Sequence, residues 1–302
     1  MNTFSAKSNS KWVVLSATVA LTTIGVLAPS AEAANFTLDF DSGVDGGDVL
    51  MNSNGTLVTD QWADWGLTNI SGINDRHGNA AKLNLYDTTS WGQDQDLRTN
   101  TYWKSGNKID PGTPAQGNVL IIQEENNSNK NYFNNNGFYR PDDEAAGGFI
   151  DFDFAEAVAF KSFSMLDIDD NGGGITVQGT RADGSYLNID IDALMAEHHN
   201  TNGTDASAQG TSVSLNGVTM TQVGRLQGDN SMFRFDVDQA FLTNVKFSYP
   251  GSGAISGLEW STGEEEPRDI PEPSAMGGLL MLGFVGSRKY LKRKQAESSE
   301  NA

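Results

Sequence analysis

The sequence predicts an all-β protein: a single antiparallel β-sandwich of jelly-roll-like order, with a signal helix at its N-terminus and a short hydrophobic helix at its C-terminus. Two observations carry this prediction for the body of the chain. Apolar and polar residues alternate with period two in several segments, which is typical of half-buried antiparallel strands. No helical pattern of about 10–15 residues alternates with these segments, which argues against a parallel α/β fold.

The composition excludes several classes of protein. The 302 residues include 39 acidic and 20 basic side chains, which give a net charge of −19. This balance argues against a nucleic-acid-binding protein, whose binding surface is basic. The chain has no cysteine, so a disulfide scaffold, a thiolate zinc site, an iron–sulfur cluster and a cysteine nucleophile are excluded. The same charge and polarity exclude a polytopic membrane protein.

The N-terminal segment, residues 1–33, has the pattern of a secretory signal peptide. Lys7 and Lys11 precede an uncharged stretch that runs from residue 12 to residue 28. An Ala-x-Ala site follows, and its residues around the expected cut are Ala31, Ala33 and Ala34. A positive region, an apolar region and a small-residue site in this order predict export by the Sec-type machinery, with cleavage before Ala34.

The expected sandwich occupies residues 34–263. Its predicted strands alternate between apolar and polar residues, except for one continuously apolar segment at 118–122; the others are 36–40, 149–154, 175–177, 186–191 and 232–237. Asn216-Gly217 separates two further runs, which predicts a two-residue hairpin turn between 212–215 and 218–222. Only residues 191–199 indicate a helix. We expect His198 and His199 in this segment to lie on the surface, because adjacent helical side chains point about 100° apart and rarely share a metal ion.

Aspartate-rich loops are the first candidate for a binding site. Calcium prefers about six to eight oxygen ligands from carboxylates and carbonyls on flexible loops. An Asp-x-Asp spacing places both carboxylates on one side of an extended segment. The candidate calcium ligands are Asp94, Asp96, Asp142, Asp143, Asp167 and Asp169. The alternative interpretation is that these are solvated, turn-forming acids.

Tryptophans in the first third of the body are the second candidate. Exposed indole rings beside Asp and Asn suit sugar binding, because the face of a sugar ring is apolar and its hydroxyls need polar partners. The candidate glycan-binding residues are Trp62, Trp65, Trp91 and Trp103. The alternative is that these rings pack in the core or under loops.

The C-terminal segment contains a second addressing pattern. An acidic linker at 264–269 is followed by Pro271-Glu272-Pro273, a hydrophobic helix expected at 274–291, and a cluster of Lys and Arg. The order of these parts over residues 270–302 resembles the PEP-CTERM sorting signal. The resemblance implies that Pro271, Glu272 and Pro273 are recognised by an exosortase-type membrane enzyme, and that the helix anchors the chain in the inner membrane before processing. Arg288-Lys289 departs from the family pattern by shortening the apolar run.

The body itself resembles a recurrent module of anchored bacterial surface proteins, for which no activity is established. The segments that carry this resemblance are 59–67, 94–97, 117–124, 141–143, 147–148, 166–169 and 250–255. The resemblance spans most of residues 36–260 and implies a surface β-sandwich, without implying catalysis.

These observations together predict an exported, non-catalytic protein of the cell surface or extracellular matrix that binds polysaccharide and calcium and does not bind nucleic acid. An extracellular polysaccharide hydrolase is the first alternative, because acids are plentiful enough to supply a catalytic pair. The sequence does not select which two, and it contains no Gly-x-Ser-x-Gly nucleophile motif. A purely structural surface spacer is the second alternative.

Overall fold

A computed structural model describes the body of the chain, with gaps at several loops. The described residues are 33–43, 55–89, 96–99, 103–105, 108–110, 113–125, 133–134, 137–138, 141–168, 173–202, 209–224 and 231–262. All of them belong to one structural unit that begins at Ala33. The predicted signal helix, the acidic linker, the Pro271-Glu272-Pro273 motif and the hydrophobic helix at 274–291 lie outside the described residues.

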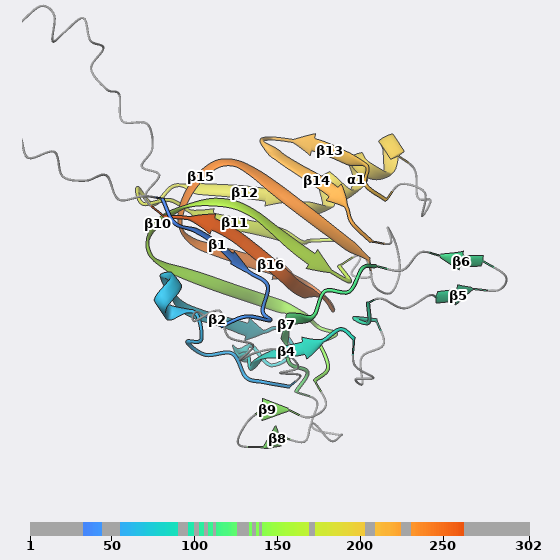
Figure 1. Cartoon of the computed structure of the whole chain (residues 1–302), viewed down its shortest axis with the longest axis horizontal. Coiled ribbons are helices and arrows are strands. Elements are labelled where there is room, and N and C mark those ends of the chain that lie inside the picture. Colours follow the sequence, from blue (N-terminus) through green and yellow to red (C-terminus); the bar gives the residue numbers. More distant parts are fainter. Residues whose placement is uncertain are drawn as a thin grey trace, which may run out of the picture. The chain divides into compact units, whose positions relative to one another are not determined.

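The described part of the chain is mostly β-strand, as the alternation predicts (Figure 1). Its elements in chain order are β1 (Asn35–Leu38), the 3-10 helix η1 (Ala63–Trp65), β2 (Leu67–Asn74), β3 (Asn79–Ala80), β4 (Leu83–Asp87), β5 (Trp103–Ser105), β6 (Lys108–Asp110), β7 (Asn118–Ile122), β8 (Phe133–Asn134), β9 (Gly137–Phe138), β10 (Gly148–Leu166), β11 (Thr176–Thr180), β12 (Tyr186–Asp190), α1 (Ile191–Asn202), β13 (Ser212–Leu215), β14 (Val218–Gln222), β15 (Met232–Tyr249) and β16 (Ala254–Ser261).

Twelve of these strands form one hydrogen-bonded sheet, whose main path runs β12-β11-β15-β10-β16-β7-β4. The pairs β5–β6 and β8–β9 form two small separate sheets. Every pairing between these named strands is antiparallel. The predicted all-β, antiparallel class is therefore confirmed.

The two long strands, β10 and β15, connect different parts of this sheet. The first part of β10 pairs with β2 and with the end of β15, and its last part pairs with β16 and the start of β15. The register of β10 shifts between Asp153 and Val158 and again between Phe160 and Ser162. Such irregularities bend a strand and increase its twist. The two parts of β10 are therefore expected to run in different directions within the sheet.

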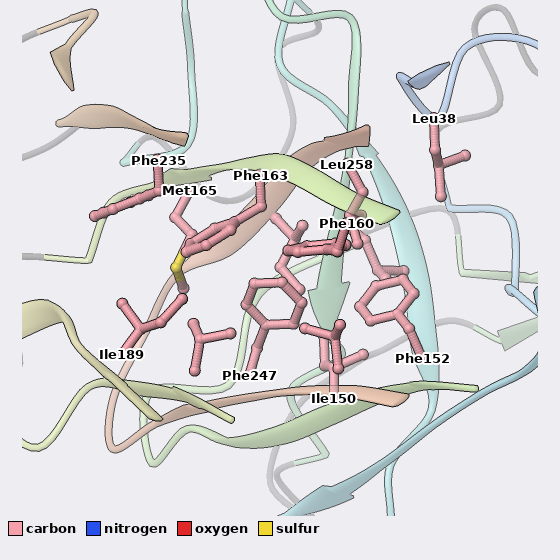
Figure 2. Close-up of a cluster of buried hydrophobic side chains, with 14 of the residues drawn as sticks. Leu38, Ile150, Phe152, Phe160, Phe163, Met165, Ile189, Phe235, Phe247 and Leu258 are labelled. Carbon is pink, nitrogen blue, oxygen red and sulfur yellow. The ribbon is translucent and has the colours of Figure 1, made fainter. Parts of the chain in front are cut away.

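The core is filled by aromatic and aliphatic side chains from both parts of the long strands. The ring of Phe163 stacks on Phe235 with centroids 4.6 Å apart and meets the ring of Phe247 nearly edge-on at 5.2 Å. Phe247 also meets Phe152 edge-on at 5.6 Å. Figure 2 shows Phe160 and Phe163 pointing toward Phe247 and Ile150, all of them fully or almost fully buried. These ring contacts join side chains from both parts of β10 and β15 into one core.

Most predicted elements are confirmed, although the boundaries of the long strands differ. The segments at 149–154 and 232–237 are only the beginnings of β10 and β15. The predicted two-residue hairpin turn has positive φ at both central residues, 51° at Asn216 and 79° at Gly217, as a type I′ turn requires. Strands β2, β4 and β16 were not predicted, nor were the short strands β3, β5, β6, β8 and β9.

The predicted helix is α1, but the expectation for its histidines was wrong for His198. The imidazole of His198 is fully buried, and its Nε2 lies 2.9 Å from the hydroxyl oxygen of Thr211. A helix packed on a hairpin buries one side of itself, and α1 contacts β13 and β14. Within the described residues, no helix is both long and apolar enough to cross a membrane.

Candidate functional site

Two of the four tryptophan candidates, Trp62 and Trp65, are packing residues rather than an exposed platform. Trp62 is only 1% exposed. Its indole N–H donates a hydrogen bond to the backbone carbonyl of Ser42 at 2.9 Å, and its ring meets Phe40 edge-on at 5.5 Å. The protein therefore covers the faces of this ring, which leaves no surface for a sugar.

Trp65 is half-buried and belongs to a second aromatic group. Its ring lies 5.9 Å from that of Phe36 and 6.5 Å from that of Trp260. Trp103 begins β5 opposite Asp110, and Trp91 lies outside the described residues. Trp62 is therefore not available for a glycan, because its ring is buried in the core.

The acidic loop at Pro141–Glu144 holds neighbouring turns in place. A carboxylate oxygen of Asp143 accepts a hydrogen bond from the backbone N–H of Gly253 at 2.6 Å, in the turn between β15 and β16. The backbone N–H of Asp142 donates to the side-chain oxygen of Gln123 at 3.4 Å. The loop therefore ties the β15–β16 turn to the end of β7.

The next residue, Glu144, forms a buried ion pair. Its carboxylate accepts hydrogen bonds from the side-chain amide of Asn74 at 2.8 Å and from the Arg76 guanidinium at 2.7 Å. Burial raises the pKa of Glu144, but the hydrogen bonds from Ala146, Asn74 and Arg76 and the charge of Arg76 outweigh burial and hold that pKa below its usual range. Glu144 is therefore a structural carboxylate that is ionised at neutral pH.

Asp167 is also buried, at the end of β10. Its backbone N–H donates to the carbonyl of Ser231 at 2.7 Å, and its φ is 57°. A Cβ added to Gly253 would lie 3.2 Å from the backbone oxygen of Asp167, so Asp143 and Asp167 both reach the same β15–β16 turn. Asp96 is exposed, while Asp94 and Asp169 lie outside the described residues.

A further acidic group lies where β1 ends. Asp41 accepts a hydrogen bond from the backbone N–H of Asn118 at 2.8 Å. Its pKa is raised by burial and by the negative charges of Asp39 and Asp87, against the lowering effect of the Asn118 bond. In the part of the chain that the structure describes, no three His, Cys, Asp or Glu side chains gather in a way that could hold a metal ion.

A different surface emerges on the solvent side of β2, β10, β15, β11 and β12. Directly paired residues in a sheet project their side chains to the same side, so the strand registers define three rows across these five strands. We call this surface the polar face; its rows are Asn69–Asp153–Asn244–Thr180–Tyr186, Ser71–Asp151–Lys246–Gln178–Asn188 and Ile73–Phe149–Ser248–Thr176–Asp190. None of these side chains is buried, whereas the residues between them on β10 and β15 are.

Hydrogen bonds between neighbouring strands fix the first row. One carboxylate oxygen of Asp153 accepts from the amide of Asn69 at 2.9 Å, and the other accepts from the amide of Asn244 at 2.7 Å. In the second row, the amide of Gln178 donates to the side-chain oxygen of Asn188 at 2.9 Å. These side chains are therefore held in defined positions although they face solvent.

The second and third rows meet at Lys246. Its ammonium lies 3.3 Å from the centroid of the Phe149 ring, a cation–π contact. Burial raises the pKa of the neighbouring Asp151, an effect that the charge of Lys246 and a hydrogen bond with Asn244 oppose and the charge of Asp153 reinforces. Phe149 is thus covered by a cation on one side.

Tyr186 ends the first row at the edge of the sheet. It is 57% exposed and is the one large hydrophobic side chain that is exposed among the described residues. It follows the β11–β12 turn, where Gly184 has a φ of 81°. The polar face therefore combines an open aromatic ring with positioned amides and carboxylates, which can bind a ligand by ring contact and hydrogen bonding together.

The alternation in the sequence indicates that one side of each strand is polar, but it does not reveal this site. The five strands that form the polar face come from residues 67 to 249, and β2 was not predicted. Only the registers show that Asn69, Asp153 and Asn244 are neighbours.

In comparisons with known proteins, no family model, no curated protein and no solved structure matches the chain.

Proposed function

We propose that this chain is an exported, non-catalytic protein of the cell surface or extracellular matrix that binds polysaccharide through the polar face. The observation that carries the proposal is the combination of an exposed Tyr186 with side chains fixed by the hydrogen bonds to Asp153. Ligand sites generally combine apolar or aromatic contact with a few well-placed polar groups.

The addressing patterns of the sequence support the export part of the proposal. Residues 1–33 match a signal peptide for Sec-type export, and residues 270–302 resemble a PEP-CTERM sorting segment. In this proposal the C-terminal helix anchors the chain in the inner membrane until an exosortase-type enzyme processes it near Pro271-Glu272-Pro273. The body then reaches the cell surface or the matrix.

A jelly-roll-like β-sandwich is the architecture that we propose for the body. The bend of β10 at its two register shifts and the contact between Phe163 and Phe247 support it. A sandwich leaves two outer sheet faces in solvent, of which the polar face is one.

Calcium binding by the aspartate-rich loops is part of the same proposal. The two terminal segments hold seven of the 20 basic residues but only four of the 39 acidic ones, so the body is more acidic than the whole chain. Bound calcium would reduce the repulsion among these carboxylates. Asp94, Asp96, Asp142, Asp143, Asp167 and Asp169 are its proposed ligands, and Asp143 among them also bonds to the Gly253 turn.

A hydrolase is the second candidate function, and Asp151 with Asp153 is the observation that favours it. Asp151 and Asp153 are two residues apart on β10, so their side chains project from the same side of the strand and their backbones are about 6.6–6.8 Å apart. From these positions the two carboxyl groups can reach the separation of roughly 6.5–9.5 Å that is typical of inverting glycosidases. Burial raises the pKa of Asp151, as a general acid requires. Against this, both oxygens of Asp153 accept amide hydrogen bonds.

One experiment separates these functions. The purified chain is mixed with insoluble cellulose, chitin and starch, the bound fraction is measured by sedimentation, and new reducing ends are measured in the same samples. Binding without new reducing ends is the expected result. New reducing ends that disappear in Asp151→Asn would establish the hydrolase instead. If the chain neither binds nor cleaves any of these polymers, the structural spacer is the remaining function.

A further inference from the structure

The first row of the polar face has the length and composition of an extended binding track. It crosses five neighbouring strands, from Asn69 on β2 to Tyr186 on β12. Four inter-strand intervals of about 4.8 Å give a track of roughly 19 Å. A track of this kind suits a chain molecule with repeated polar groups better than a compact metabolite.

The middle of the track is organised before any ligand binds. The carboxylate of Asp153 lies between two amides, one from β2 and one from β15, and accepts a hydrogen bond from each. Asn244 also bonds to Asp151, so its amide group is held from two sides. Groups that are already fixed lose less conformational entropy on binding, which favours affinity.

The end of the track offers an exposed ring, which Trp62 does not. Tyr186 is 57% exposed, whereas Trp62 is 1% exposed. Phe149 lies in the third row, but the Lys246 ammonium lies against its ring. Tyr186 is thus the one ring of the first row, and an apolar sugar face has one stacking partner there.

The charges of the polar face restrict which polysaccharide can bind. Three carboxylates, those of Asp151, Asp153 and Asp190, face solvent with a single ammonium, that of Lys246. Like charges repel, so a polymer of uronic acids is disfavoured, whereas the hydroxyls of a neutral sugar can donate hydrogen bonds to these carboxylates. Resting on the proposed function, we infer that the first row of the polar face is the binding site for an uncharged polysaccharide, with Tyr186 as its stacking ring and Asp153 as its central acceptor.

The test measures the mobility shift of the full purified chain in gels that contain hydroxyethyl cellulose, dextran or alginate, without added divalent cations. The wild type is expected to be retarded by a neutral polymer and not by alginate. Tyr186→Ala is expected to bind the neutral polymer about tenfold more weakly, while Tyr186→Phe keeps the ring and the binding. Asp153→Asn is expected to bind the neutral polymer several-fold more weakly. Because it removes one negative charge, it is also expected to repel alginate less than the wild type does.

Asp238→Asn is the matched control, because Asp238 is an exposed aspartate of β15 outside the three rows. It removes the same charge and is expected to bind as the wild type does. Thermal melts of each variant show that the fold is retained. Retardation of the wild type by the neutral polymer with no effect of Tyr186→Ala or Asp153→Asn overturns this site while leaving the proposed function. Preference for alginate overturns the ligand class. No binding to any of the polymers overturns the proposed function and the site with it.

Discussion

Replacing Glu144 by Gln tests whether the acidic loop stabilises the fold. The side chain of Glu144 is 0% exposed, and its partner Arg76 is 35% exposed. Arg76 also reaches Glu124 at 3.1 Å, and Asn74 donates to the second oxygen of Glu144. Glu144→Gln keeps the size of the side chain but removes its charge, so the Arg76 guanidinium loses its closest partner.

The expected cost follows from this geometry. Removing one partner of a fully buried ion pair costs about 3–5 kcal/mol. Arg76 is partly solvated, so water screens part of the lost charge, and we expect Glu144→Gln to lower the free energy of unfolding by about 2 kcal/mol. A domain of this size loses about 2–4 °C of Tm for each kcal/mol, so the melting temperature should fall by about 4–8 °C.

Urea denaturation of the wild type, Glu144→Gln, Arg76→Met and the double variant measures the coupling between the two side chains. The pKa of Glu144 is lowered in the folded state. Its contribution is therefore complete above the ordinary carboxyl pKa of 4.5 and is lost as the pH falls through the lowered value. The difference between wild type and Glu144→Gln should be full at pH 7 and shrink below about pH 4.5. A coupling energy below about 0.5 kcal/mol, or a difference that does not change with pH, would refute the reasoning.

Three further predictions concern the core, a buried histidine and calcium. Trp62→Ala should lower the free energy of unfolding by about 3–5 kcal/mol in urea denaturation, and an unchanged stability would show that this ring is not a core residue. Burial lowers the pKa of His198 from 6.5, against a smaller raising effect of its bond with Thr211. Its contribution to stability is therefore present above pH 6.5 and is lost as the pH falls through the lowered value. The stability of the wild type should therefore decrease as the pH falls below 6.5, and His198→Gln should make this decrease smaller. A decrease equal to that of the wild type would contradict the assignment. EDTA should lower the melting temperature of the chain and added calcium should restore it; a melt that EDTA leaves unchanged would remove calcium from the proposed function.

The hairpin at Asn216-Gly217 shows how far the sequence alone can predict structure. A type I′ turn needs positive φ at both central residues, and Asn and Gly adopt this conformation with least strain. The turn is therefore encoded locally, and its observed φ values agree. The same holds for α1, whose first turn is capped by Asp190 through a hydrogen bond from the backbone N–H of Ala193 at 2.9 Å.

The acidic residues show where such prediction stops. Composition indicated many carboxylates in loops, but the roles of individual acids depend on contacts between residues far apart in the chain. Asp143 is bonded to Gly253, which is 110 positions away, and Glu144 to Asn74, which is 70 positions away. Contacts over such separations produce no pattern in the neighbouring sequence. The residues around Asp143 and Glu144 therefore look like those of a solvated turn.

The sequence by itself determined the all-β class, the antiparallel pairing and the polar character of one side of each strand, because side-chain alternation and turn chemistry act over a few residues. Only the tertiary structure decided which polar sides join into one surface and which aromatic rings stay exposed. Strand register is a property of two segments at once, so the row from Asn69 to Tyr186 exists only when β2, β10, β15, β11 and β12 are paired. The burial of Trp62 and the exposure of Tyr186 follow from that same pairing and the packing it imposes.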